Sequence, residues 1–146
     1  MQEMLHDPVF RVFAICAAIL VFKMALMGSM TGLLRLRTGA YITPEDYAFM
    51  GRQPTPPDET VERYRRVHQN DLENIPPFLI LGHLYMLSGP SYGVAATLFI
   101  AFTAARIAHT VTYLASVQPW RSIAFEVGQI ALLVTAILLV INVWAG

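Results

Sequence analysis

A nearly unbroken aliphatic run close to the end of the chain, Ile130–Val143, restricts the fold more than any other feature. It lies inside a longer apolar segment, Arg121–Trp144, which exceeds the roughly 20 residues that a helix needs to cross a bilayer. Three earlier segments also reach this length, so four membrane-spanning helices are expected. The other three run from about Val9 to Leu34, Val61 to Leu87 and Tyr92 to Ser116.

The composition supports lipid as the main solvent. Hydrophobic residues make up 55% of the chain and charged residues 14%, whereas soluble domains carry about 25% charged residues. The formal net charge is zero, which gives no indication of a nucleic-acid partner. The single cysteine, Cys16, rules out an intrachain disulfide, and no two of the four histidines are spaced i,i+4, so no metal site is expected.

The connections predict how the helices are arranged. Short turns at Ser88–Ser91 and Gln118–Trp120 favour antiparallel neighbours, so we expect an all-α, antiparallel four-helix bundle that forms one domain over residues 1–146. The connection over residues 35–60 is long, polar and rich in proline. Arginines border this loop, and Arg121 borders the later turn. Because basic residues concentrate in cytoplasmic loops, both connections are predicted to face the cytoplasm and the termini to face the opposite side.

Polar side chains recur at helical spacing within the last three segments, and each set shares one helix face. Antiparallel packing would bring the three faces to a common depth. A charge in the hydrocarbon region costs at least about 2.5–3.5 kcal/mol, so Glu73, Arg106 and His109 require a ligand or mutual pairing. Arginines bind carboxylates in bidentate fashion, which favours an anionic, peptide-like ligand. The stripes are Arg66, Asn70, Glu73 and Pro77; Arg106, His109 and Tyr113; and Arg121, Ser122, Phe125 and Gln129.

Several polar residues also have a purely structural interpretation. The arginines within Arg63–Arg66 would serve as headgroup anchors, and Glu62 and Arg66 would form an ordinary i,i+4 pair. Lys23 either extends to the headgroups or pairs with a carboxylate of the second segment. Gly28 and Gly32 form a small-xxx-small pattern that predicts close helix packing.

Several sequence blocks along the chain form a recognisable set. They are Glu62-Arg63, Arg66-Val-His68, Asn70–Ile75, Pro77-Phe-Leu79, Ser88-Gly-Pro90, Arg106–Thr110, Tyr113-Leu114 and Pro119-Trp-Arg121, with Lys23, Arg35-Leu-Arg37 and Pro44-Glu-Asp46. Taken together, these blocks resemble the MAPEG family, the membrane-associated proteins in eicosanoid and glutathione metabolism. The resemblance covers nearly the whole chain and is strongest to the glutathione transferase and prostaglandin E synthase branches.

The resemblance implies a homotrimer with three glutathione sites between adjacent subunits, toward the cytoplasmic side. Gln69 and Phe125 occupy two positions of this binding set where the prostaglandin synthase branch has a basic residue and a tyrosine, and both departures favour the transferase. Glu126 and Pro76 also depart from the family pattern. The remaining binding residues, matched by position, would be Arg35, Arg66, Asn70, Glu73, Arg106, His109, Tyr113, Arg121, Ser122 and Gln129.

The implied activity is that of a membrane-bound glutathione transferase with glutathione as cosubstrate or cofactor, in a bacterial inner membrane or the endoplasmic reticulum. Arg121 and Ser122 match the residues nearest the sulfur and would stabilise a thiolate that attacks a hydrophobic electrophile or a lipid hydroperoxide. Asp46 matches an acidic residue of the prostaglandin isomerase chemistry, so an endoperoxide isomerase is the alternative. A non-enzymatic, lipid-binding accessory protein is a third hypothesis, which predicts an eroded glutathione site.

Overall fold

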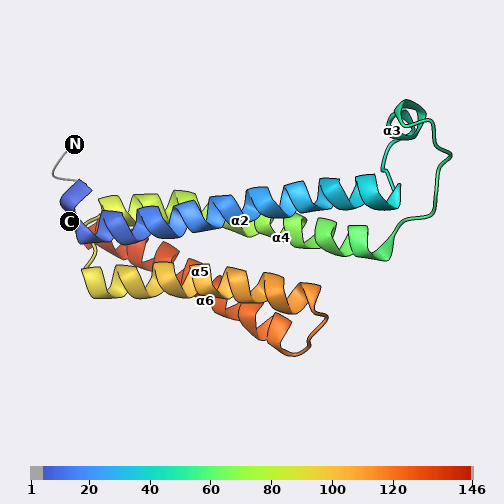
Figure 1. The fold of residues 1–146 in the computed structure, drawn as a ribbon. Helices are drawn as coiled ribbons and strands as arrows, with labels where there is room; N and C mark the ends of the chain where they lie inside the picture. The colour runs from blue at the N-terminus through green and yellow to red at the C-terminus, as the bar shows by residue number, and fades with distance from the viewer. Residues whose placement is uncertain (1–4, 146) are drawn as a thin grey trace.

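The computed structural model describes residues 5–145; residues 1 to 4 and 146, which the expected single domain also includes, lie outside the described part. Within residues 5–145 the chain is helical and forms no strand. Four long helices and one short helix follow each other along the chain (Figure 1). They are α2 (Pro8–Thr38), α3 (Pro44–Phe49), α4 (Glu59–Leu87), α5 (Tyr92–Leu114) and α6 (Trp120–Ala145).

Local sequence signals explain where the first long helices begin and end. Asp7 accepts a hydrogen bond from the backbone N–H of Val9 at 2.6 Å, and Asp58 accepts one from Val61 at 3.0 Å, so both α2 and α4 begin at a carboxylate cap. Helix α2 ends at Gly39, whose φ of 75° lies in the left-handed region that favours glycine.

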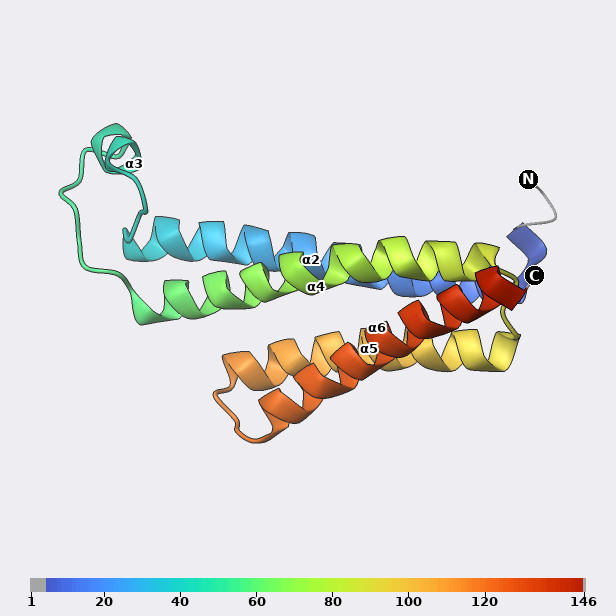
Figure 2. The same cartoon turned by 180° about the vertical axis from the view of Figure 1, so that it is seen from behind.

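The long helices run antiparallel to their neighbours in sequence, as the short turns predict (Figures 1 and 2). Helix α2 packs on α4, and the α5–α6 hairpin packs against both. Helices α2 and α4 extend past the turn that joins α5 to α6, and the loop with α3 lies at that extended end. The start of α2, the end of α6 and the α4–α5 turn lie at the opposite end of the molecule.

Aromatic rings pack against each other in the half of the helix bundle nearest the α4–α5 turn. The Phe78 and Phe102 rings stack with their centroids 3.9 Å apart, and Phe99 meets both Phe13 and Phe78 edge to face. Gly82 leaves room for Phe13, because a Cβ at residue 82 would lie 2.8 Å from that ring. This aromatic core holds α2, α4 and α5 together and adjoins a layer of polar side chains inside the bundle.

By length and composition, three of the described helices can cross a membrane, namely α2, α5 and α6. Exposed aliphatic side chains cover α6, among them Ile130, Ile137 and Val140, as expected for a surface in lipid. Helix α4 is not among the three because charged and polar residues fill its first half. The second expected span is thus less apolar than the other three.

Candidate functional site

The guanidinium of Arg106 on α5 is the centre of the polar groups inside the molecule. Arg106 is 0% exposed. Its Nη2 donates to the Phe125 carbonyl oxygen on α6 at 2.9 Å, and its Nη1 donates to Asn70 Oδ1 on α4 at 3.3 Å. The guanidinium carbon also lies 5.5 Å and 5.2 Å from the ring centroids of Phe102 and Phe125. One side chain therefore joins three helices at a single depth.

Gly128 provides the space that Arg106 occupies. A Cβ at this position would lie 2.8 Å from Arg106 Nε, closer than real Cβ atoms approach other heavy atoms, and 3.0 Å from Cζ. Sequence reasoning missed this residue, and only its spacing of one turn from Phe125 and Ala124 hinted that it faces inward. Glycine is needed here to admit a guanidinium between α5 and α6.

A second group of side chains lies one turn toward the α5–α6 turn. His109 is buried, and its Nδ1 lies 3.1 Å from the Arg121 carbonyl oxygen. Its ring contacts those of Tyr113 and Phe125, with centroids 5.6 Å and 5.7 Å apart. The Arg121 guanidinium lies over the Tyr113 ring, 4.7 Å from its centroid. Residues of the predicted stripes on α5 and α6 thus come together, as expected for antiparallel neighbours.

Gln118, in the turn before α6, links the two candidate catalytic residues. A guanidinium can only donate hydrogen bonds, so the Gln118 amide oxygen is the group that faces Arg121. In this orientation the oxygen accepts from Arg121 Nε at 3.1 Å, and the amide nitrogen donates to Ser122 Oγ at 3.2 Å. Sequence reasoning did not single out Gln118, because a turn residue shows no helical spacing.

Two further polar contacts lie inside the bundle. Lys23 on α2 pairs with Asp71 on α4, with Nζ and Oδ1 2.5 Å apart. Of the two alternatives for Lys23, the structure therefore shows the pairing with a carboxylate of the second segment. Gln129 Nε2 donates to Asn74 Oδ1 at 2.5 Å, so the polar layer continues across α4 and α6.

The predicted stripe on α4 faces away from the interior of the single chain at three of its four positions. Arg66, Glu73 and Pro77 are exposed, and only Asn70 reaches the interior. The buried face of α4 is instead formed by neighbouring positions, which include Val67, Asp71, Asn74 and Phe78. Helical spacing shows which residues share a face, but it does not show which face turns inward.

The exposed face of α4 carries polar side chains that bond to each other. Gln69 donates to Glu73, with Nε2 and Oε1 3.0 Å apart. The expected pair between Glu62 and Arg66 is not formed, because Glu62 pairs with Arg65 at 2.8 Å. Arg66, Gln69 and Glu73 are therefore available on the outside of this chain.

The last two predicted residues lie away from Arg121 within a single chain. Arg35 and Asp46 line a cavity of about 300 Å³ between the end of α2 and α3, together with Tyr41 and Phe49. Within the described part of the chain, α3 packs against none of the other helices. The structure thus brings Asp46 near Arg35 and leaves it separate from the α5–α6 groups.

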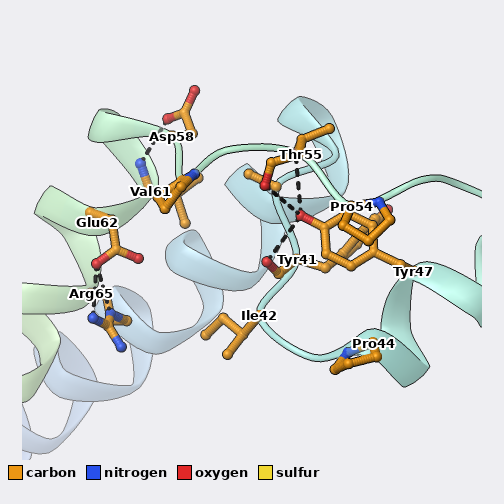
Figure 3. Close-up of a pocket in the computed structure, with 12 residues that line it drawn as sticks. Tyr41, Ile42, Pro44, Tyr47, Pro54, Thr55, Asp58, Val61, Glu62 and Arg65 are labelled. Atoms are coloured by element: carbon orange, nitrogen blue, oxygen red, sulfur yellow. Dashed lines mark hydrogen bonds and ion pairs between the residues drawn. The ribbon is translucent and has the colours of Figure 1, made fainter.

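A further cavity of about 340 Å³ lies between the long loop and the start of α4 (Figure 3). The Tyr47 hydroxyl bonds the Tyr41 carbonyl oxygen at 3.2 Å and Thr55 Oγ1 at 3.1 Å. These contacts hold the two arms of the loop together. The Glu62–Arg65 pair lies at the opposite wall.

Comparison with known proteins extends these observations. The sequence profile of the MAPEG family matches residues 13–141. Microsomal glutathione S-transferase 1 of Homo sapiens is 42% identical over 134 residues, which span 88% of this chain and 86% of that protein. Prostaglandin E synthase of Bos taurus is 41% identical over 130 residues, with 88% and 85% covered. Prostaglandin E synthase of Homo sapiens is 40% identical over 128 residues. On the extent of these matches, the chain belongs to the MAPEG family.

Proposed function

We propose that this chain is a membrane-bound glutathione transferase whose site lies beside α5 and α6, near their connecting turn. Relatives that are 42% and 41% identical over the aligned residues are named glutathione S-transferase and prostaglandin E synthase. The transferase is favoured because Gln69 and Phe125 stand where the prostaglandin branch has a basic residue and a tyrosine. Glutathione, an anionic tripeptide, is the expected cosubstrate.

The observation that carries the proposal is a buried guanidinium without a carboxylate partner. The ion pairs among the described residues are Lys23–Asp71, Arg63–Glu59 and Arg65–Glu62, and none includes Arg106. Arg106 is completely buried, and its Nε has no hydrogen-bond partner. A buried charge is costly unless it is paired. An anionic ligand would supply the missing partner, with Arg121 as a second guanidinium nearby.

The proposed chemistry starts from the thiol of glutathione. Arg121 would stabilise the thiolate by its charge, which lowers the thiol pKa, and Ser122 would donate a hydrogen bond to the sulfur. The thiolate then attacks an electrophilic carbon and expels its leaving group. With a lipid hydroperoxide it attacks the terminal oxygen, the O–O bond breaks and the alcohol leaves. A second glutathione then forms the disulfide and releases water.

The proposed assembly accounts for the polar face of α4. In an isolated chain Arg66, Gln69 and Glu73 are exposed, and at membrane depth such groups need cover. We infer that two further copies of the chain provide it, in a homotrimer of antiparallel four-helix bundles that includes α4 as the fourth span. Arg35 and Asp46 would then reach the site from a neighbouring copy. The site would open toward the cytoplasm, and the second substrate would enter from the lipid.

Conjugation of 1-chloro-2,4-dinitrobenzene to glutathione by the purified, detergent-solubilised protein tests the catalytic assignment. Arg121→Ala should lose most of the activity, whereas Arg37→Ala, which removes an exposed arginine at the end of α2, should retain it. Equal rates for wild type and Arg121→Ala would show that the assignment is wrong. Calorimetry without any glutathione binding would favour the accessory-protein hypothesis.

The endoperoxide isomerase remains the second candidate, because prostaglandin E synthases are as similar in sequence as the transferase. It predicts product formation without net consumption of glutathione. It also predicts loss of that activity in Asp46→Ala, while conjugation of chlorodinitrobenzene continues. An unchanged rate of isomerisation in Asp46→Ala would argue against it.

A further inference from the structure

Lys23 and Asp71 form a buried ion pair that the proposed mechanism does not use. Lys23 Nζ lies 2.5 Å from Asp71 Oδ1, and the two side chains are 11% and 1% exposed. The residues are 48 positions apart in the chain and join α2 to α4. Asp71 Oδ2 has no hydrogen-bond partner among the described residues, so half of this carboxylate stays available.

Arg106 is the natural competitor for that carboxylate. It donates to Asn70, the residue directly before Asp71, so its guanidinium lies close to the turn of α4 that carries the carboxylate. A buried arginine next to a buried carboxylate normally forms a bidentate pair. Here the carboxylate is held by Lys23 instead, and Arg106 bonds a neutral amide and a backbone carbonyl.

All four long helices contribute charged or polar groups to the buried layer around Lys23, Asp71 and Arg106. Helix α2 provides Lys23, α4 provides Asp71, and α5 provides Arg106 with the histidine His109. Helix α6 provides Gln129, which is neutral, and carbonyl oxygens. The layer therefore contains two permanent cations and one carboxylate. One positive charge is left over, and the pairing places it on Arg106.

We propose that Lys23 is a positioning residue, which holds the Asp71 carboxylate away from Arg106 and so keeps that guanidinium free for the anionic ligand. The inference rests on the proposed glutathione function for the identity of that ligand. Lys23 itself need not touch glutathione. In a variant without Lys23, the Asp71 carboxylate would pair with Arg106 and neutralise its positive charge. Arg106 would then bind the anionic ligand less strongly.

Glutathione binding by calorimetry on purified variants tests this role. Lys23→Met should weaken binding about tenfold or more, because the arginine loses one charge-assisted contact to the ligand. Lys23→Met with Asp71→Asn should restore the affinity to within about threefold of wild type. Asp71→Asn alone should keep it, because Arg106 stays free. Thr31→Val is the matched control for a buried change on α2. The Thr31 hydroxyl bonds only its own helix, so this variant should bind glutathione like wild type.

Two results would overturn the proposal. One is a folded Lys23→Met variant that binds glutathione like wild type. The other is a double variant that folds but stays as weak as Lys23→Met, because without the Asp71 carboxylate nothing in the protein would compete with the ligand for Arg106.

A second measurement does not depend on glutathione. The coupling between Asp71 and Arg106 is obtained from thermal unfolding of Asp71→Asn, Arg106→Gln and the combined variant. It should be small with Lys23 present and larger in the Lys23→Met background, and equal coupling in both would refute the proposal. If wild type fails to bind glutathione, the proposed function falls, and this cycle alone decides the role of Lys23.

Discussion

Gly128 on α6 faces the guanidinium of Arg106 on α5 so closely that no side chain fits between them. Gly128→Ala should therefore push the guanidinium off Asn70 and the Phe125 carbonyl. Overpacking of this kind costs about 1–3 kcal/mol of unfolding free energy, and we expect glutathione affinity to fall with it. Gly93→Ala is the control, because a Cβ there meets nothing within 4 Å. Unchanged binding by Gly128→Ala would show that Arg106 tolerates displacement.

The contact between Arg121 and the Tyr113 ring yields a second prediction. A cation over an aromatic face is stabilised by about 0.5–2 kcal/mol, so Tyr113→Leu should release Arg121 and lower the rate of conjugation. Tyr113→Phe keeps the ring and should retain more activity than the leucine variant. Steady-state kinetics with glutathione and chlorodinitrobenzene separate the two. Equal loss in both variants would assign the effect to the hydroxyl rather than to the ring.

Gln118 bonds both Arg121 and Ser122, and its replacement should alter thiolate formation. In Gln118→Leu the guanidinium loses its amide partner and becomes less ordered beside the sulfur. We expect the thiol of bound glutathione to ionise at higher pH, since a weaker positive field stabilises the thiolate less. Ultraviolet absorbance of the thiolate, followed across pH, measures this shift. Gln53→Leu in the exposed loop should leave the titration where it is.

The stacked rings of Phe78 and Phe102 belong to the apolar core, and Phe102 lies directly against the Arg106 guanidinium. Phe78 is completely buried, and replacing such a residue with alanine costs about 3–5 kcal/mol. Phe78→Ala should lower the thermal unfolding midpoint and loosen α4 against α5. Phe49→Ala removes a ring that is 87% exposed and should leave the midpoint nearly unchanged. Similar midpoints for both variants would contradict this view of the core.

Much of this arrangement could be predicted from the sequence, for reasons that particular residues illustrate. Apolar length and short turns predict the long helices and their antiparallel order. The three-and-four spacing of Arg106, His109 and Tyr113 correctly groups side chains that meet in the structure. These signals are local, because they depend only on helix geometry.

The remaining features depend on how neighbouring helices turn toward each other. The buried face of α4 carries Asp71 and Asn74 as well as apolar residues, so polarity alone does not distinguish it from the exposed face with Arg66 and Glu73. The roles of Gly128 and Gln118 likewise depend on where side chains of other segments end. No spacing within one helix reveals such contacts.

The extension of α2 and α4 past the α5–α6 turn has a consequence for α4 as a membrane span. Helix α4 has 29 residues and is about 43 Å long at 1.5 Å per residue, whereas the hydrocarbon layer is about 30 Å thick. In the proposed orientation the surplus length would be the charged first part of the helix, residues 59–65, which would stand in water and headgroups. In this proposed orientation the α5–α6 turn would lie closer to the bilayer than the start of α4. Glutathione would then reach the proposed site from the water, and a hydrophobic substrate would reach it through the bilayer.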